Sequence, residues 1–214
     1  MKLFSYFRSS AAFRVRIALN LKGVPYQVVP IHLLKSGGEQ FSEQYVKTNP
    51  LSLVPVLEDG DQVLFQSMAI IEYLEERYPE PALLPPDPMA RAYVRAIAQT
   101  IACDIHPLNN LRVLRYLVRE LHVSDQDKDA WYRHWVEMGL GQLDRIVVSR
   151  GLSGRYAFGD QVTMADLTIV PQIFNARRFG CDLASAPTLA AICDRCMELD
   201  AFARAEPSAQ PDAD

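Results

Sequence analysis

Two adjacent serines, Ser9 and Ser10, precede a segment with helical periodicity. A hydroxyl group at a helix N-terminus stabilises an anion twice, by a hydrogen bond and through the positive end of the helix dipole. A bound thiol would benefit, because a free thiol has a pKa of about 8.5 and is mostly protonated at neutral pH. The pair could therefore keep a bound sulfur ionised, although a simple helix cap is the better explanation when only the local sequence is considered.

Two further features are suited to binding carboxylates. Arg8 directly precedes the serine pair, so it must lie near a thiol held there. The planar guanidinium of arginine binds a carboxylate better than the point charge of lysine does. A second predicted helix begins at Gln66 and Ser67, where side chains and free amides could hold another carboxylate. A simple helix cap explains that pair about equally well.

The elements that must position these residues alternate in type over the first 79 residues. An aromatic strand over 3–7 leads into a helix that begins at the serine pair and ends before Gly23. The elements that follow are a strand over 26–31, a short irregular helix over 41–45, a hairpin of 54–57 and 63–65, and a helix from 67 to about 79. This order, β-α-β and then β-β-α, predicts an α/β domain.

A proline-rich segment separates this domain from a helical one. Residues 79–88 hold five of the 14 prolines, which make a stiff, extended connector. We therefore expect a first domain over 1–79, a linker over 80–88 and an all-helical domain over 89–214. Its predicted helices cover about 90–118, 127–148 and 188–199, together with an apolar, buried helix that opens with a capping box of Thr163 and Asp166. The polar segment over 207–214 should fray.

Composition excludes several classes of protein. With 49% hydrophobic and 22% charged residues the chain is globular, and its net charge of −4 disfavours nucleic acid as a partner. No apolar run approaches the roughly 18 residues of a membrane span, and the first residues do not resemble a signal peptide, so we expect a soluble cytoplasmic protein. Four cysteines are too few for a disulfide scaffold; Cys193 and Cys196 should be packing residues, with no metal bound.

Several separated motifs, in the correct order, strongly resemble the zeta class of glutathione transferases, the family of maleylacetoacetate and maleylpyruvate isomerases. The motifs are SSAAFRVRIAL (9–19), LVP (53–55), QS (66–67), AIIEYL (69–74), IHPLNN (105–110), VTMADL (162–167) and PQ (171–172). The resemblance extends over nearly the whole chain. One departure is Ala11, where the family usually has a cysteine, so a thiol at that position cannot be the essential nucleophile here.

The resemblance implies a thioredoxin-like α/β domain, an all-α domain and a site in the cleft between them, with glutathione as the cofactor. Ser9 is then the residue that stabilises the glutathione thiolate, and a cis Pro55 exposes the backbone of Val54 to the cysteinyl part of glutathione. The other expected glutathione-binding residues are Ser10, Gln40, Gln66, Ser67, Asp104, His106 and Asn110. For the last three, a structural role explains the sequence about equally well. The resemblance would let Asp104 act across a homodimer interface.

The resemblance also implies a substrate with two carboxylates, a maleyl keto acid, and three arginines that could bind it: Arg8, Arg112 and Arg178. Arg177 lies beside Arg178, and one of the two should only pair with its helix C-terminus. The expected reaction is addition of thiolate to the cis double bond, rotation about the resulting single bond and elimination to the trans product. Arg8 or Arg178 would stabilise the enolate charge, so Ser9, Arg8 and Arg178 are the expected catalytic residues.

The sequence leaves alternatives open. It does not separate maleylacetoacetate from maleylpyruvate, although Arg112 could favour the shorter substrate. A general glutathione transferase acting on small electrophiles such as α-halo acids is a second reading, and a non-catalytic interaction protein with this fold is a third.

Overall fold

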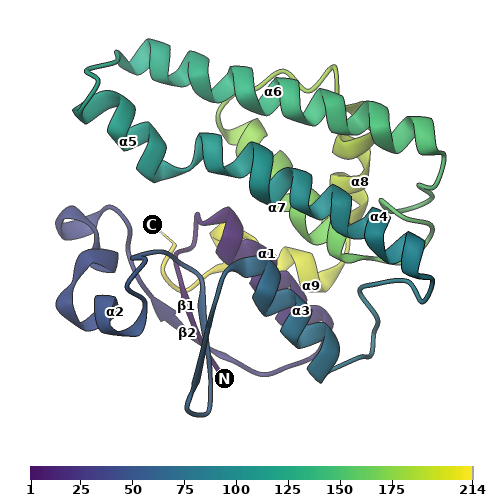
Figure 1. Ribbon diagram of the computed structural model, residues 1–214, viewed down its shortest axis with the longest axis horizontal. Coiled ribbons are helices and arrows are strands. Elements are labelled where there is room, and N and C mark those ends of the chain that lie inside the picture. Colours follow the sequence, from purple (N-terminus) through teal and green to yellow (C-terminus); the bar gives the residue numbers. More distant parts are fainter. Residues whose placement is uncertain (214) are drawn as a thin grey trace. The chain divides into compact units, whose positions relative to one another are not determined.

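The computed structural model describes residues 1–213, and its chain divides into two compact units (Figure 1). The first unit consists of Met1–Ala82 and the segment from Glu198 onward, and the second consists of Leu83–Met197. The division falls inside the proline-rich segment. The prediction that 198–214 belongs to the helical domain differs from the structure, in which the described part of that segment packs with the first unit. Its anchors include Arg16 Nε, which donates to the Ala205 carbonyl, and Asn20 Nδ2, which donates to the Ala201 carbonyl.

The first unit is built on a four-stranded sheet in the order β2-β1-β3-β4. Its strands are β1 (Lys2–Ser5), β2 (Gln27–Pro30), β3 (Val56–Asp59) and β4 (Gln62–Phe65). The parallel pair β1 and β2 needs a crossover, which α1 (Ser10–Leu21) provides, whereas β3 and β4 form an antiparallel hairpin. This topology confirms the predicted order β-α-β, β-β-α, and the ends of the strands differ from the predicted bounds by at most two residues.

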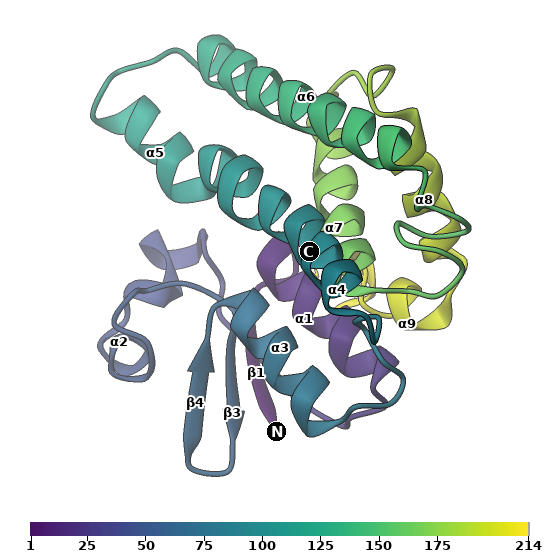
Figure 2. The same ribbon diagram turned by 45° about the vertical axis from the view of Figure 1, so that its right-hand side comes forward.

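The helices of this unit complete a thioredoxin-like arrangement. They are α1, α2 (Glu43–Thr48), α3 (Ser67–Arg77) and α9 (Asp200–Ala203), with 3-10 helices at Lys35–Gly37, Glu39–Phe41 and Pro207–Ala209. Figure 2 shows α1 and α3 side by side against the sheet. The prediction that 207–214 frays is wrong for the described residues, because Gln210 Nε2 donates to the carbonyls of Arg204 and Glu206 and folds the segment back.

The second unit is helical throughout. Its helices are α4 (Pro88–Gln99), α5 (Leu111–Arg119), α6 (Asp125–Arg150), α7 (Met164–Arg178) and α8 (Pro187–Met197). The prediction of one helix over 90–118 is wrong: a π-helix at Thr100–Ile105 and a 3-10 helix at His106–Asn109 separate α4 from α5. Pro107 lacks the N–H that would continue the helix, and Asn110 Oδ1 accepts the Arg112 N–H and starts α5 anew.

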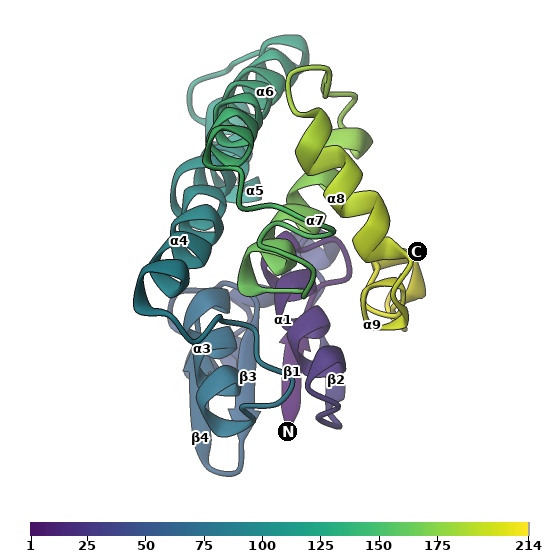
Figure 3. The ribbon, with the colours of Figure 1, turned by 90° about the vertical axis from the view of Figure 1, so that its right-hand side faces the viewer.

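Helix α7 forms the core of this unit, as expected, and Figure 3 shows it between α4 and α8. The predicted capping box is present: the Asp166 carboxylate accepts the Thr163 N–H at 2.7 Å, and it also accepts the Ala157 N–H at 2.8 Å. Complete burial nevertheless raises the pKa of Asp166 to about 6. On α8, Cys193 and Cys196 are buried side chains, which confirms their packing role. Within residues 1–213, no helix combines the length and apolar character needed to cross a membrane.

Candidate functional site

The register of the sheet brings four loops of the first unit to one edge. Strand β1 ends at Ser5, opposite the end of β2 at Pro30. Val56, the first residue of β3, pairs with Phe4 of β1 and with Phe65, the last residue of β4. The chain leaving β1, β2 and β4 and the chain entering β3 therefore lie at the same edge. These four connections carry every candidate residue of the first unit.

Ser9 is the N-cap of α1. Its Oγ accepts the Ala12 N–H at 3.2 Å, and its own N–H donates to the Tyr6 carbonyl at 2.9 Å, which closes the turn after β1. With the oxygen engaged as an acceptor, the hydroxyl hydrogen can point to an anion outside the helix. The helix cap and the anion donor are therefore compatible roles of one serine.

Arg8 lies on an aromatic support next to Ser9. Its guanidinium carbon is 4.7 Å from the centre of the Phe7 ring, a cation–π distance, and the Phe7 ring packs edge-on against Tyr6 at 4.8 Å. Phe7 is buried, so it is a rigid surface for the arginine. Phe7 was not singled out from the sequence, where it reads only as a strand residue.

The start of α3 differs from an ordinary helix cap. Gln66 has φ 70° and ψ 117°, a sparsely populated backbone conformation, and its side chain makes no capping hydrogen bond. A simple cap therefore does not explain Gln66, and the first amides of α3 can meet an anion. Ser67 is 5% exposed, and its Oγ accepts from the buried Arg14 Nη1 at 3.3 Å. Arg14 thus links α1 to the start of α3.

Gln40 is buried in a tightly organised loop. Its Oε1 has no hydrogen-bond partner among the described residues. Gly38 has φ 116°, a conformation that favours glycine, and a Cβ there would lie 2.6 Å from Gln40 Nε2 and displace this amide. His32 Nδ1 accepts the backbone N–H groups of Leu34 and Lys35, and the Glu39 carboxylate accepts the His32 N–H at 2.6 Å. Sequence reasoning missed both His32 and Glu39, because no local pattern marks them.

The peptide bond between Val54 and Pro55 is cis, as the family resemblance implied. The preceding carbonyl, that of Leu53, accepts the Tyr45 hydroxyl at 2.6 Å and Asn49 Nδ2 at 2.8 Å. These bonds fix the chain as it enters β3. Burial raises the pKa of Tyr45, so its hydroxyl stays a donor.

In the second unit, the segment from Thr100 to Asn110 carries Asp104, His106 and Asn110. Asp104 is exposed on the π-helix, while the Asn110 side chain caps α5. Helix α6 holds this segment at two points. Trp131 Nε1 donates to the Leu108 carbonyl at 2.8 Å, and Gly139 leaves space for Ile105, whose Cγ1 would be 2.6 Å from a Cβ at position 139.

The two arginines at the end of α7 have different surroundings. Arg177 Nη1 contacts the Asp194 carboxylate of α8 at 2.7 Å, and this hydrogen bond raises the pKa of Arg177. The Arg178 guanidinium carbon lies 4.8 Å from the centre of the Phe179 ring, which stacks on Tyr132 at 3.8 Å. Arg178, the arginine chosen from the sequence, is thus the one supported by stacked rings. Arg112 is exposed on α5.

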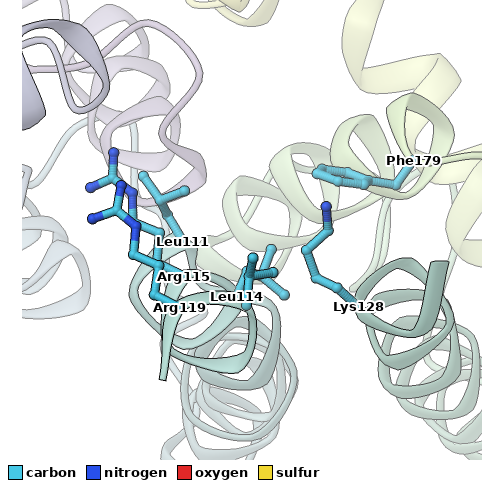
Figure 4. A pocket seen from close by; sticks show the side chains of 7 residues that line it. Leu111, Leu114, Arg115, Arg119, Lys128 and Phe179 are labelled. Carbon is cyan, nitrogen blue, oxygen red and sulfur yellow. The ribbon is translucent and has the colours of Figure 1, made fainter. Parts of the chain in front are cut away.

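The second unit contains a cavity of about 280 Å³. Two of its lining residues are sequence neighbours of candidate arginines: Leu111 precedes Arg112, and Phe179 follows Arg178. Figure 4 shows Arg115 and Arg119 of α5 on one side and Phe179 with Lys128 on the other. Leu114 and Val118 complete its lining. The lining thus combines apolar side chains with three cationic residues.

The sheet and the cap of α1 lie in a region that matches a known family of proteins. The family model "Glutathione S-transferase, N-terminal domain" matches residues 1–76. A curated relative from Vibrio cholerae, "Probable maleylacetoacetate isomerase", is 48% identical over 99% of this chain and 97% of its own.

Two solved structures are similar to this chain over nearly its whole length and indicate which class of glutathione transferase it belongs to. A holo maleylpyruvate isomerase, described as a bacterial zeta-class glutathione transferase, is 47% identical, covers both chains fully and has a TM-score of 0.97. A maleylacetoacetate isomerase from Anaeromyxobacter dehalogenans, with bound dicarboxyethyl glutathione and citrate in the active site, is 43% identical over 100% of this chain and 97% of its own, with a TM-score of 0.86. The chain belongs to the zeta class of glutathione transferases, the family of the maleylacetoacetate and maleylpyruvate isomerases.

Proposed function

We propose that this chain is a glutathione-dependent cis–trans isomerase that converts a maleyl keto acid, maleylacetoacetate or maleylpyruvate, into its fumaryl isomer. The observation that carries the proposal is the Ser9 hydroxyl at the N-terminus of α1, whose oxygen is occupied by the Ala12 N–H and whose hydrogen can be donated. The relatives named isomerases support the same activity.

The first unit has groups that fit glutathione. The start of α3, where Gln66 leaves the helix amides uncapped, suits the glutamyl carboxylate, and the backbone at Val54 suits the cysteinyl part. The buried amide of Gln40 suits the glycyl end. Ser10 and Ser67 line the two helix starts. When bound, glutathione supplies the thiolate that adds to the cis double bond and leaves after rotation. Ser9 and the dipole of α1 keep that sulfur ionised.

The arginines provide the charge that the substrate requires. Arg8 and Arg178 each lie over a buried or stacked aromatic ring, which limits their rotation and pre-orients them toward a carboxylate or a developing enolate. Arg112 is an additional carboxylate ligand. Asp104, His106 and Asn110 complete the proposed glutathione contacts, although Asn110 also caps α5.

Ala11 defines how this chain must differ from relatives with a cysteine there. No thiol can act from position 11, so the only sulfur in the proposed reaction is that of glutathione. Isomerisation should therefore depend completely on added glutathione.

An absorbance assay with maleylacetoacetate and maleylpyruvate, each with and without glutathione, tests the proposal. We expect turnover with at least one substrate, no turnover without glutathione, and no net consumption of the thiol. Consumption of glutathione without isomerisation would instead establish a transferase. Failure of the protein to bind glutathione at all would point to a non-catalytic interaction protein.

The proposal includes assembly as a homodimer, which the resemblance implies, and a cytoplasmic location, which we expect from the sequence itself. Light scattering after size-exclusion chromatography measures the first, and a monomer at working concentration would contradict it. Fractionation of cells of the source organism, with detection by antibody, measures the second.

A further inference from the structure

The backbone of Phe7 is held by charged side chains on both of its polar atoms. Its N–H donates to Asp212 Oδ2 at 3.0 Å, and its carbonyl accepts from Arg16 Nη2 at 3.0 Å. Asp212 lies 205 residues further along the chain, in the segment that folds back onto the first unit. Hydrogen bonds with one charged partner are roughly twice as strong as neutral ones. Phe7 immediately precedes the turn that carries Arg8 and Ser9.

Arg16 on α1 connects the end of β1, the Phe7 peptide and the C-terminal segment. It is fully buried on α1, and besides Phe7 it donates to Ser5 Oγ at 3.0 Å and to the Ala205 carbonyl at 2.9 Å. Burial lowers the pKa of Arg16 to about 10, while the charges of Tyr26 and Asp212 act in the opposite direction. Arg16 therefore stays charged at neutral pH and links the end of β1 to the C-terminal segment.

Phe7 in turn determines where Arg8 lies. The Phe7 ring supports the Arg8 guanidinium at 4.7 Å, and the neighbouring Tyr6 carbonyl accepts the Ser9 N–H at 2.9 Å. A shift of the Phe7 peptide would displace both residues. Such a displacement would slow the reaction, because misplacement of a reacting or binding group by about 1 Å can cost about a hundredfold in rate.

We propose that Asp212, acting with Arg16 through Phe7, is a positioning residue for Arg8 and Ser9. The role rests on the proposed function, since it concerns the same site. In this role the C-terminal segment orients the active-site turn, in addition to packing against the first unit.

Three variants separate positioning from general stability. Asp212→Ala removes the acceptor for the Phe7 N–H. Asp212→Asn keeps an acceptor oxygen of similar shape but removes the charge. Ser208→Ala is the matched control, because Ser208 is exposed on the 3-10 helix of the same segment, whereas Asp212 makes the bond to the Phe7 N–H.

The first readout needs no glutathione and no substrate. Amide hydrogen exchange at Phe7, resolved by NMR, should be about tenfold faster in Asp212→Ala than in Ser208→Ala, with Asp212→Asn in between. The second readout is kinetic: kcat/KM for isomerisation should fall about tenfold in Asp212→Ala and be partly restored in Asp212→Asn. If Asp212→Ala fails to fold, the comparison of Asp212→Asn with Ser208→Ala decides.

Unchanged exchange at Phe7, or unchanged kcat/KM with faster exchange, would overturn the inference. Failure of the proposed function is distinguishable, because the wild-type chain would then show no glutathione-dependent turnover whatever the Phe7 amide does. A loss of activity in Ser208→Ala equal to that in Asp212→Ala would also overturn it, since any disturbance of the segment would then suffice.

Discussion

The turn at Arg8–Ser10 and the segment from Thr100 to Asn110 both carry candidate site residues, yet they are held in different ways. The turn is fixed by a side-chain cap at Ser9 and by Asp212 and Arg16 on the Phe7 peptide. The segment is a π-helix followed by a 3-10 helix, neither of which has a side-chain cap at its start. Its contacts with neighbouring helices include two with α6, at Trp131 and Gly139. We infer that the turn is the stiffer of the two regions.

The largest expected effect lies in the turn. Ser9→Ala should lower kcat/KM by about a hundredfold or more, because it removes a preorganised donor to a developing or bound anion. It also removes a helix cap, which costs about 1 kcal/mol of stability. Ser9→Asp separates these effects, since aspartate caps α1 but its charge opposes a thiolate. Steady-state kinetics and urea unfolding measure the two quantities. Full activity in Ser9→Ala would contradict the assignment.

The arginines at the end of α7 give the next largest effect. Arg178→Ala should lower kcat/KM about tenfold or more, as loss of a charged hydrogen-bonding partner to a carboxylate does. Arg177→Ala is the matched control, because it removes an exposed ion pair with Asp194, which is worth at most about 1 kcal/mol. Kinetics with saturating glutathione measure both. Equal losses in the two variants would contradict the preference for Arg178.

The contrast between the turn and the 100–110 segment also explains what the sequence could predict. The cap at Ser9, the end of α1 near Gly23 and the capping box at Thr163 depend on neighbouring residues, so their signals are local. The break between α4 and α5 was missed because apolar periodicity continued through it, although Pro107 and Asn110 were visible signals. The Asp212–Phe7 bond spans 205 residues and follows only from the fold.

A smaller effect is expected where α6 supports the 100–110 segment. Gly139→Ala places a Cβ 2.6 Å from Ile105 Cγ1, and overpacking of this kind costs about 1–3 kcal/mol. Gly141→Ala on the same helix is the matched control, because its Cβ would meet Ser185 Oγ at 2.8 Å, away from the segment. Urea unfolding should show similar losses of stability in both. Only Gly139→Ala should raise the KM for glutathione, by about threefold, by displacing Asp104 and His106. Equal KM values in the two variants would contradict the role of the segment.

The smallest expected effect concerns the chemical reactivity of two cysteines, one in the 100–110 segment and one in the core of the second unit. Cys103 is exposed on the π-helix, whereas Cys193 is buried in α8 and burial raises its pKa to about 12. The thiolate is the reactive form, so at pH 8 iodoacetamide should modify Cys103 first and leave Cys193 intact in the folded protein. Peptide mass spectrometry over time measures the order. Since Asp104 is the next residue, the adduct should lower glutathione affinity only a few-fold, and Cys103→Ser should abolish that sensitivity. Early modification of Cys193 would contradict this expectation, because it would mean that α8 opens more readily than the 100–110 segment.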